Sequence, residues 1–306
     1  MFLGLPNAHL QHTLSHNIFK TIQSHLISQS LPEDKIRITS CSATGAAAFL
    51  RCPAKAPGAF FTNQEFQLAI KLRIKAPLSL ACPTTCMCGH FLDVYRYGDH
   101  LFKCRIGGEW YQRHLSIVRV VSDAIRSTGL NVQQEVPLQN IGPIRSLDTR
   151  GDGRMDTVIT SSDFQTTLAD VTITHPSPSH QAITLNMTRP LYFATAAEER
   201  KIRKYDRAAR QINNTFIPMA LETFGALGRE ANKFLKKLAS RYLRSLPNPE
   251  ISNRSILMRY WRSKISCTLQ RANAKLIISK SNRIKANTRQ GPLPNSPDMT
   301  DNWQIV

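Results

Sequence analysis

Residues 152–176, "DGRMDTVITSSDFQTTLADVTITHP", contain two short apolar runs separated by the turn-like segment "SSDFQ". Runs of this length, rich in Val, Ile and Thr, predict two neighbouring β-strands. Each run carries an aspartate, Asp156 in the first and Asp170 in the second, although a buried strand disfavours a charged side chain. Two carboxylates at one edge of a sheet can hold Mg²⁺, which prefers oxygen ligands. The stretch therefore predicts both part of a sheet and a candidate cation site.

The segments around this stretch complete an α/β pattern. Residues 109–128 repeat apolar side chains at helical spacing before Gly129, and "AEERKIRKYDRAARQI" (197–212) also has a helical pattern. "VQQEVPL" (132–138) and "NTFIPMAL" (214–221) have the composition of strands. The order helix, three strands, helix, strand predicts an α/β fold with a small mixed β-sheet flanked by helices.

The helix at 197–212 carries lysines that could complete a hydrolytic site. Lys201 and Lys204 would add positive charge beside the two aspartates and help to orient an attacking water. Glu135, near the strand that precedes Asp156, is a further candidate acidic ligand. Aspartates at strand ends and solvated lysines are common, so these residue types alone are a weak signal for catalysis.

Cysteine and histidine are concentrated in residues 82–104. The pattern C-x-C-x11-H-x3-C is formed by Cys86, Cys88, His100 and Cys104. Three thiolates and one imidazole form the closed tetrahedral shell of a structural Zn²⁺ site. Cys82 and His90 are alternative ligands, and free reduced thiols in a core are the alternative without a metal. The odd total of seven cysteines suits a reducing compartment better than a disulfide framework.

The chain is strongly basic, with 40 Lys and Arg against 21 Asp and Glu in 306 residues, a formal charge of +19. Residues 229–289 hold much of this excess. Such a density of positive charge favours binding to a polyanion, most often nucleic acid. A solvated basic surface and a helix lying on an anionic membrane are the alternatives. The first residues lack a signal-peptide pattern and no apolar stretch reaches the ~18 residues of a spanning helix, which predicts a soluble intracellular protein.

Residues 1–80 are predicted to be mostly helical. Within them, Thr62 and Glu65 have the spacing of a capping box before "NQEFQLAIKLRI". The apolar face of that helix is predicted to contain Phe66, Ala69 and Ile70.

Six short motifs follow one another along the chain. They are "CMCGHFLDVYRYGDHLFKC", "GGEWYQRH", "GRMD", "ADVTITHP", "AEERKIRKY" and "FIPMALETFGALGREANKFLKKLA". In this order they resemble the restriction-like endonuclease domain at the C-terminal end of a class of non-LTR retrotransposon polyproteins. That domain belongs to the PD-(D/E)XK nuclease superfamily. The first motif resembles the family's zinc knuckle, and the combination, from about Gly45 to Leu238, is far more specific than any single motif.

The resemblance implies a metal-dependent DNA endonuclease that nicks duplex DNA. Asp156 and Asp170 match the family's metal-binding acids, which implies catalytic Mg²⁺. Lys201 matches its catalytic lysine, and Lys204 is an adjacent candidate.

Two positions depart from the family pattern. Met155 stands where the family has a proline, which shapes the backbone and takes no part in the chemistry. Thr172, two residues after Asp170, stands where most of the wider superfamily has its lysine. The site therefore depends on how the helix that carries Lys201 packs against the sheet.

These expectations divide the chain into five parts. We predict a helical N-terminal linker region, a zinc knuckle, a restriction-like endonuclease core, a basic helical region and a disordered tail, at 1–80, 81–108, 109–225, 226–289 and 290–306.

Several other residues have two interpretations each. Arg113 and His114 are interpreted as a surface pair, with a phosphate contact as the alternative. Glu222 is interpreted as a helix cap or a salt-bridge partner. Tyr260 and Trp261 could stack on bases or pack in the core.

The sequence leaves competing functions open. The alternative to an endonuclease is a non-catalytic zinc-knuckle module that binds DNA or RNA, and an inactive relic is a third hypothesis. The chain contains no Y-x-D-D motif of a reverse transcriptase, so a detached or domesticated fragment of a retrotransposon is expected. We expect a nuclear location and no membrane partner, whereas the pattern says nothing about the oligomeric state.

Overall fold

A computed structural model gives the fold of most of the chain. The described residues are 7–52, 60–78, 85–92, 97–147, 151–161, 164–177, 189–246 and 251–290.

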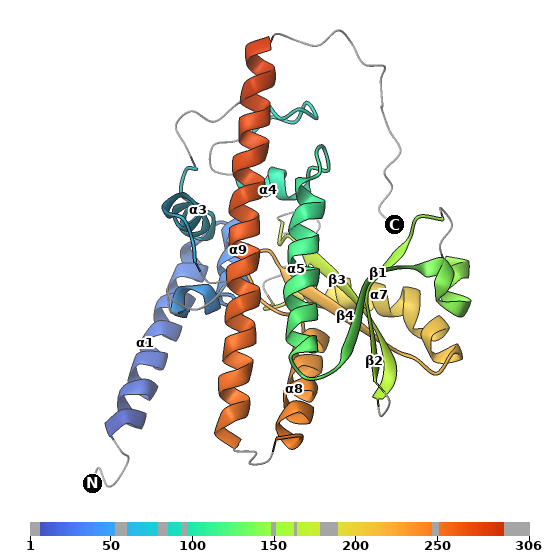
Figure 1. Cartoon of the computed structure of the whole chain (residues 1–306). Coiled ribbons are helices and arrows are strands. Elements are labelled where there is room, and N and C mark those ends of the chain that lie inside the picture. Colours follow the sequence, from blue (N-terminus) through green and yellow to red (C-terminus); the bar gives the residue numbers. More distant parts are fainter. Residues whose placement is uncertain are drawn as a thin grey trace.

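The centre of the fold is a four-stranded sheet in the order β1-β2-β3-β4 (Figure 1). Its strands are β1 (Asn131–Pro137), β2 (Arg154–Ser161), β3 (Phe164–Thr174) and β4 (Thr215–Glu222). The pairs β1–β2 and β2–β3 are antiparallel, whereas β3 and β4 run parallel. A parallel pair requires a crossover, which here contains α7 (Tyr192–Gln211). The predicted α/β fold with a mixed sheet flanked by helices is confirmed.

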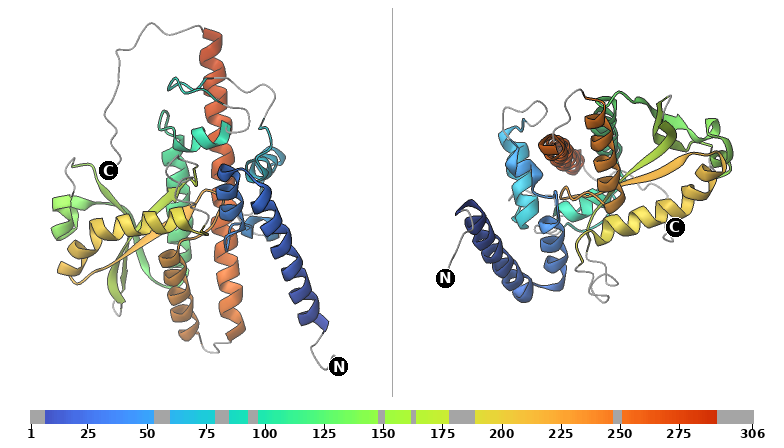
Figure 2. Two further views of the ribbon diagram at one scale, coloured as in Figure 1. Left: turned by 180° about the vertical axis from the view of Figure 1, so that it is seen from behind. Right: turned by 90° about the horizontal axis from the view of Figure 1, so that it is seen from below.

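Three helices form a hydrophobic core against one face of the sheet (Figure 2). They are α5 (Glu109–Arg126), α8 (Arg229–Arg244) and α9 (Ile251–Gln290). Ile117 and Val121 of α5 pack in the same buried cluster as Met219 of β4 and Trp261 of α9. Trp261 is therefore a core residue, whereas its neighbour Tyr260 is exposed. The core continues across the predicted boundary at 225/226, although that division of the chain stays a prediction.

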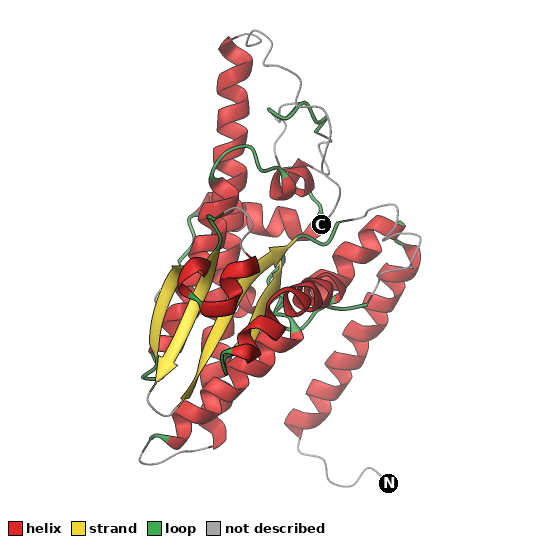
Figure 3. Cartoon of the chain, turned by 90° about the vertical axis from the view of Figure 1, so that its right-hand side faces the viewer, coloured by secondary structure: helices red, strands yellow, loops and turns green. Residues whose placement is uncertain are grey.

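The other face of the sheet is covered by α7 and by the short 3-10 turns η2 (Leu138–Asn140) and η3 (Gly142–Leu147) (Figure 3). Tyr205 and Ala209 of α7 pack there with Leu168 and Phe216. Positions 205 and 209 are one helical turn apart, so they lie on the same side of α7. This packing fixes α7 beside the strands that carry the two aspartates.

The N-terminal part is mostly helical, as predicted, and packs beside α9. Its elements are α1 (Asn7–Gln29), α2 (Pro32–Ser42), η1 (Ala48–Arg51) and α3 (Asn63–Ile74). The Thr62 side chain accepts the Glu65 N–H and the Glu65 carboxylate accepts the Thr62 N–H, which confirms the capping box. The predicted apolar face was partly wrong, because Phe66 is exposed and Leu68 is buried instead.

The long helix α9 packs both on the N-terminal helices and on the helices that cover the sheet. It contacts α5, α3, η1, α8 and α4 (Tyr97–Lys103), and its 40 residues span roughly 60 Å. No helix among the described residues is long and apolar enough to cross a membrane. Of the tail predicted to be disordered at 290–306, Gln290 is the last residue of α9 and residues 291–306 lie outside the described residues.

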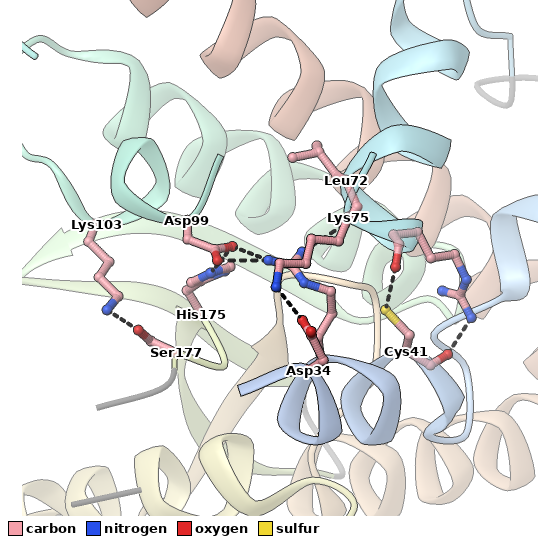
Figure 4. Close-up of polar contacts among 10 residues, drawn as sticks. Asp34, Cys41, Leu72, Lys75, Asp99, Lys103, His175 and Ser177 are labelled. Atoms are coloured by element: carbon pink, nitrogen blue, oxygen red, sulfur yellow. Dashed lines mark hydrogen bonds and ion pairs between the residues drawn. The ribbon is translucent and has the colours of Figure 1, made fainter. Parts of the chain in front are cut away.

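A buried ionic network joins α2, α4 and the end of β3 (Figure 4). Arg37 of α2 lies 2.5 Å and 2.7 Å from the two carboxylate oxygens of Asp99 in α4. Nε2 of His175, just after β3, lies 3.0 Å from the same carboxylate. The network fixes the Cys- and His-rich segment to the sheet and to the N-terminal helices.

Candidate functional site

A cavity of about 390 Å³ lies between α7 and the strands β2 and β3. Its wall is polar. It is lined by Asp156, Asp170, Lys201 and Lys204, all predicted from the sequence, together with His114 and Arg154.

Lys201 and Asp170 form an ion pair in this cavity. The lysine Nζ lies 2.9 Å from Oδ1 and 3.0 Å from Oδ2 of the carboxylate. Asp170 is only 4% exposed, since β3 is an inner strand of the sheet. Burial, and then the negative charge of Asp156, raise the pKa of Asp170, while Lys201 opposes this rise. The ionised pair of aspartates is thus stabilised by added positive charge, which a divalent cation would supply.

Asp156 is held beside Asp170 by a bond to the neighbouring strand. Its Oδ2 accepts the backbone N–H of Val171 at 2.5 Å, and its Oδ1 lies 3.0 Å from Nε2 of His114 on α5. Burial alone would lower the pKa of His114, but the hydrogen bond and charge of Asp156 outweigh it and raise that pKa. Both aspartates therefore present carboxylates to one cavity, with an amine and an imidazole beside them.

Lys204 and Thr172 complete the surroundings of the pair. The Lys204 ammonium lies over the ring of Tyr205, 5.0 Å from its centroid, whereas Lys201 is the lysine on Asp170. The Thr172 hydroxyl donates to Oδ1 of Asp170 at 3.4 Å. Thr172 thus occupies the neighbourhood that a lysine at this position would fill, and α7 supplies the ammonium instead.

Glu135 lies beside Asp156 and outside the lining of the cavity. The pairs Gln134–Thr157 and Val136–Met155 place Glu135 opposite Asp156 across β1 and β2. One ligand atom from each of His114, Glu135 and Asp156 can be chosen so that all lie within 4.8 Å of one another. Glu135, predicted as a further acidic ligand, is therefore close to Asp156.

The predicted Cys/His set also converges. One ligand atom from each of Cys86, Cys88, His100 and Cys104 lies within 4.8 Å of the others. The Sγ atoms of Cys86 and Cys104 are 3.7 Å apart, and Sγ of Cys88 lies 3.2 Å from Nε2 of His100. Tetrahedral thiolates at about 2.3 Å from Zn²⁺ are roughly 3.8 Å apart, so the set fits a metal such as zinc. We call these four residues the Cys3His cluster.

A tight turn and a short helix position the Cys3His cluster. The Gly89 N–H donates to the Cys86 carbonyl and the Cys86 N–H to the His90 carbonyl, with Gly89 at a φ of 81°. At the other side, the Cys104 N–H donates to the His100 carbonyl at the end of α4. His90 stacks on His100 with ring centroids 4.1 Å apart and is not one of the four converging residues. Cys82 lies outside the described residues.

The electrostatics of the Cys3His cluster suit a metal. Burial, foremost, and His90 lower the pKa of His100 to about 4, which keeps its imidazole in the neutral, ligating form. Burial and the neighbouring thiols raise the pKa of Cys86 to about 12, so ionisation of this thiol needs a cation. Lys280 of α9 donates to the carbonyls of Leu101 and Cys104 and places a positive charge nearby.

One interpretation from the sequence was wrong and another is supported. Arg113 and His114 are not a surface pair, because Arg113 is 6% exposed and His114 lies on Asp156. The Arg113 guanidinium packs over the Phe102 ring at 5.2 Å and holds α4 against α5. Glu222 accepts the Ala194 N–H in the first turn of α7, which agrees with the interpretation as a helix cap.

His114 is the site residue that sequence reasoning missed. It belongs to "GGEWYQRH", but no spacing rule links a helix to the carboxylate of a strand 42 residues later. Its helical position, one turn before the buried Val118, was the available signal. That position lies on the side of α5 that faces the sheet.

A scan against protein-family models finds no match, and a search of curated proteins finds none. The chemistry of the site therefore rests on its own residues. Paired carboxylates, an ammonium and an open polar cavity can bind a divalent cation and a phosphate group, and the Cys3His cluster can hold a structural metal.

Proposed function

We propose that this protein is a metal-dependent endonuclease that hydrolyses phosphodiester bonds in DNA. The observation that carries the proposal is the contact between Lys201 and Asp170 in the same cavity as Asp156. This is the trio that the sequence resemblance assigns to catalysis. We propose a restriction-endonuclease-like core, which agrees with a mixed sheet that has helices on both faces.

Asp156 and Asp170 would hold a divalent cation such as Mg²⁺. Their fit to a cation follows from the raised pKa of Asp170, which burial and the charge of Asp156 cause together. A cation bound there would supply Lewis-acid stabilisation of phosphoryl oxygens and activation of water.

The side chains around the acids have distinct roles in this proposal. The Lys201 ammonium stabilises negative charge that develops on the phosphoryl group and orients the attacking water. The Val171 N–H holds the Asp156 carboxylate toward β3, and Thr172 positions the Asp170 carboxylate. Tyr205, buried between α7 and the sheet, keeps the backbone of the lysine helix in place.

Positive charge beside the cavity supports DNA as the substrate. The exposed side of α7 carries Arg200, Arg203, Lys204 and Arg207. A row of cations next to the acids would bind the phosphates that flank the scissile bond. Access to DNA implies a nuclear location.

We propose that the Cys3His cluster binds Zn²⁺ as a zinc knuckle. All four ligands come from the protein, so the metal would fold this segment and leave no position for chemistry. The adjacent α4 is fixed to the sheet by Asp99, which places the knuckle beside the proposed nuclease.

A nicking assay tests the proposal. The zinc-loaded full chain is incubated with supercoiled plasmid and Mg²⁺ or Mn²⁺, with and without EDTA. Asp170→Asn keeps the shape of the side chain but removes a charge, and should lower nicking at least ~100-fold. Asp206→Asn is the matched control, since Asp206 lies on α7, is not among the residues that line the cavity and pairs with Arg210. Nicking that persists in EDTA or in Asp170→Asn would contradict the proposal.

A second candidate, a non-catalytic module that binds DNA or RNA, is favoured by the exposed cations of α8. Lys233, Lys236, Lys237 and Arg244 are exposed there. This function predicts salt-sensitive binding without nicking. In a fluorescence anisotropy titration against salt, Lys236→Gln with Lys237→Gln should reduce the slope of log K against log salt by about 2.

A further inference from the structure

Glu135 has a backbone conformation that its neighbours in β1 do not share. Its φ is 53°, in the left-handed region that non-glycine residues adopt only at a cost of roughly 1–2 kcal/mol. The Arg154 side chain donates to the Glu135 carbonyl at 3.2 Å, and Gln134 and Val136 still pair normally with β2. The strand therefore keeps its register while Glu135 is held in an unusual orientation opposite Asp156.

One of the two oxygens of the Glu135 carboxylate has a hydrogen-bond partner among the described residues, and the other has none. Its Oε2 accepts the Tyr111 hydroxyl at 3.1 Å. Its Oε1 is fully buried and has no hydrogen-bond partner among the described residues. A buried, unpartnered carboxylate oxygen is costly unless a cation or donor meets it. This oxygen is the observation that points to a ligand.

His114 and Asp156 lie within reach of this carboxylate. Ligand atoms of His114, Glu135 and Asp156 can all lie within 4.8 Å of one another, and Nε2 of His114 is already 3.0 Å from Oδ1 of Asp156. Ligands that share one divalent cation at about 2.1 Å are up to roughly 4.2 Å apart. A small movement of side chains would thus allow all three to bind one ion.

We propose that His114, Glu135 and Asp156 form a second cation site, which shares Asp156 with the site of Asp156 and Asp170. The inference rests on the proposed function for this shared aspartate. An imidazole nitrogen with two carboxylates suits Mn²⁺, Co²⁺ or Zn²⁺ better than Mg²⁺, which prefers oxygen ligands. The two cation sites thus differ in their ligands, and the site that contains His114 of α5 is selective for a transition metal.

The two positions can be distinguished without measuring activity. Mn²⁺ is titrated into the zinc-loaded full chain and followed by electron paramagnetic resonance, with pulsed detection of ¹⁴N coupling. We expect bound Mn²⁺ with one coupled nitrogen. His114→Leu should abolish the coupling, and Glu135→Gln, which keeps the side-chain shape, should weaken that Mn²⁺ at least ~10-fold. His25→Gln, an exposed histidine of α1, is the matched control and should change nothing.

Asp170→Asn separates this inference from the proposed function. This variant should lose nicking yet retain the ¹⁴N-coupled Mn²⁺, since Asp170 is not a ligand of the second site. Bound Mn²⁺ without nitrogen coupling in the wild type overturns the inference even if the protein nicks DNA. Retained coupling in His114→Leu, with a folded circular dichroism spectrum, also overturns it. Coupling that depends on His114 in a protein that never nicks DNA supports the cation site and contradicts the nuclease.

Discussion

Side chains converge at two places in the molecule, the Cys3His cluster and the cavity lined by Asp156 and Asp170, which we call the acidic cleft. The two differ in the elements that hold their side chains in place. The cleft takes its acids from regular strands inside a hydrophobic core and opens into a cavity of about 390 Å³. The Cys3His cluster lies on a tight turn and a seven-residue helix, and its four ligands surround one point. The cleft therefore keeps its shape through core packing and has room for a substrate. Cys86 and Cys104 pack in a hydrophobic core with α3 and α9, whereas Cys88 is exposed, so in the proposed zinc knuckle the metal would hold the exposed side of the cluster together.

The largest effect should come from removing a ligand of the Cys3His cluster. Cys88 is exposed, so Cys88→Ser loses little packing, yet we expect loss of stoichiometric zinc and of hydrogen-exchange protection in residues 85–104. Plasma emission spectrometry measures the zinc, and exchange mass spectrometry follows the segment. Exchange in β2 and β3 should change little. Equal loss of protection in the sheet would remove the contrast between the two sites.

Loss of the lysine in the cleft should have a large effect on activity and a small one on zinc. Lys201→Met should lower the rate of nicking by about 10²–10³, because the ammonium on Asp170 is lost. Lys204→Met is the matched control and should lower the rate far less, because both ammonium groups lie over the Tyr205 ring but it is Lys201 that forms the ion pair with Asp170. If the two variants are equally impaired, the assignment of Lys201 is wrong.

A smaller effect should come from breaking the Arg37–Asp99 ion pair, which belongs to the network that joins α4 to the end of β3. Arg37→Met leaves the largely buried Asp99 carboxylate with His175 as its partner among the described residues, and should lower the free energy of unfolding by about 3 kcal/mol. Urea denaturation measures this change. Lys75→Met breaks the more exposed ion pair with Asp34 and should cost less than about 1 kcal/mol. Similar costs for both variants would show that the Asp99 network does not anchor α4.

The smallest expected effect is a pH dependence of the unfolding free energy that comes from Glu198 of α7. Burial raises the pKa of Glu198 to about 7, although its carboxylate accepts the N–H groups of Glu230 and Ala231. A carboxyl group with a raised folded-state pKa stabilises the fold fully below about pH 4.5, and this contribution is lost as pH rises through about 7. Wild type should thus lose about 2 kcal/mol of unfolding free energy relative to Glu198→Gln between pH 5 and pH 8. Parallel urea titrations at both pH values measure the difference, and no difference would contradict the raised pKa.

Local patterns in the sequence predicted much of the fold. Strand composition around Asp156 and Asp170, the helical period before Gly129 and the Thr62–Glu65 capping box all predicted elements that the structure contains. Phe66 shows the limit of such patterns. Its spacing fits an apolar face, but which side of a helix is buried depends on the neighbours that pack on it, here α9.

Prediction of the site was limited by distance along the chain. Lys201 and the Cys3His ligands follow from short motifs, and the structure brings each set together. The contact of His114 with Asp156 and the strained backbone of Glu135 do not, although Glu135 itself was predicted as an acidic ligand, because both arise from the approach of α5 to β1 and β2. A positive φ at a glutamate has no signal in the sequence, since it is imposed by the contacts of the finished sheet.

The position of α9 has a consequence for how the chain is made. It is the last described helix to leave the ribosome, yet α3, which ends at Ile74, and α5 both pack on it. More than 200 residues separate Ile74 from Gln290, which at roughly 5–20 residues per second means a delay of about 10–40 s. During that interval the apolar sides of α3 and α5 are not yet packed against α9. Nascent chains of this protein should accordingly be strong clients of ribosome-associated chaperones until α9 has left the ribosome.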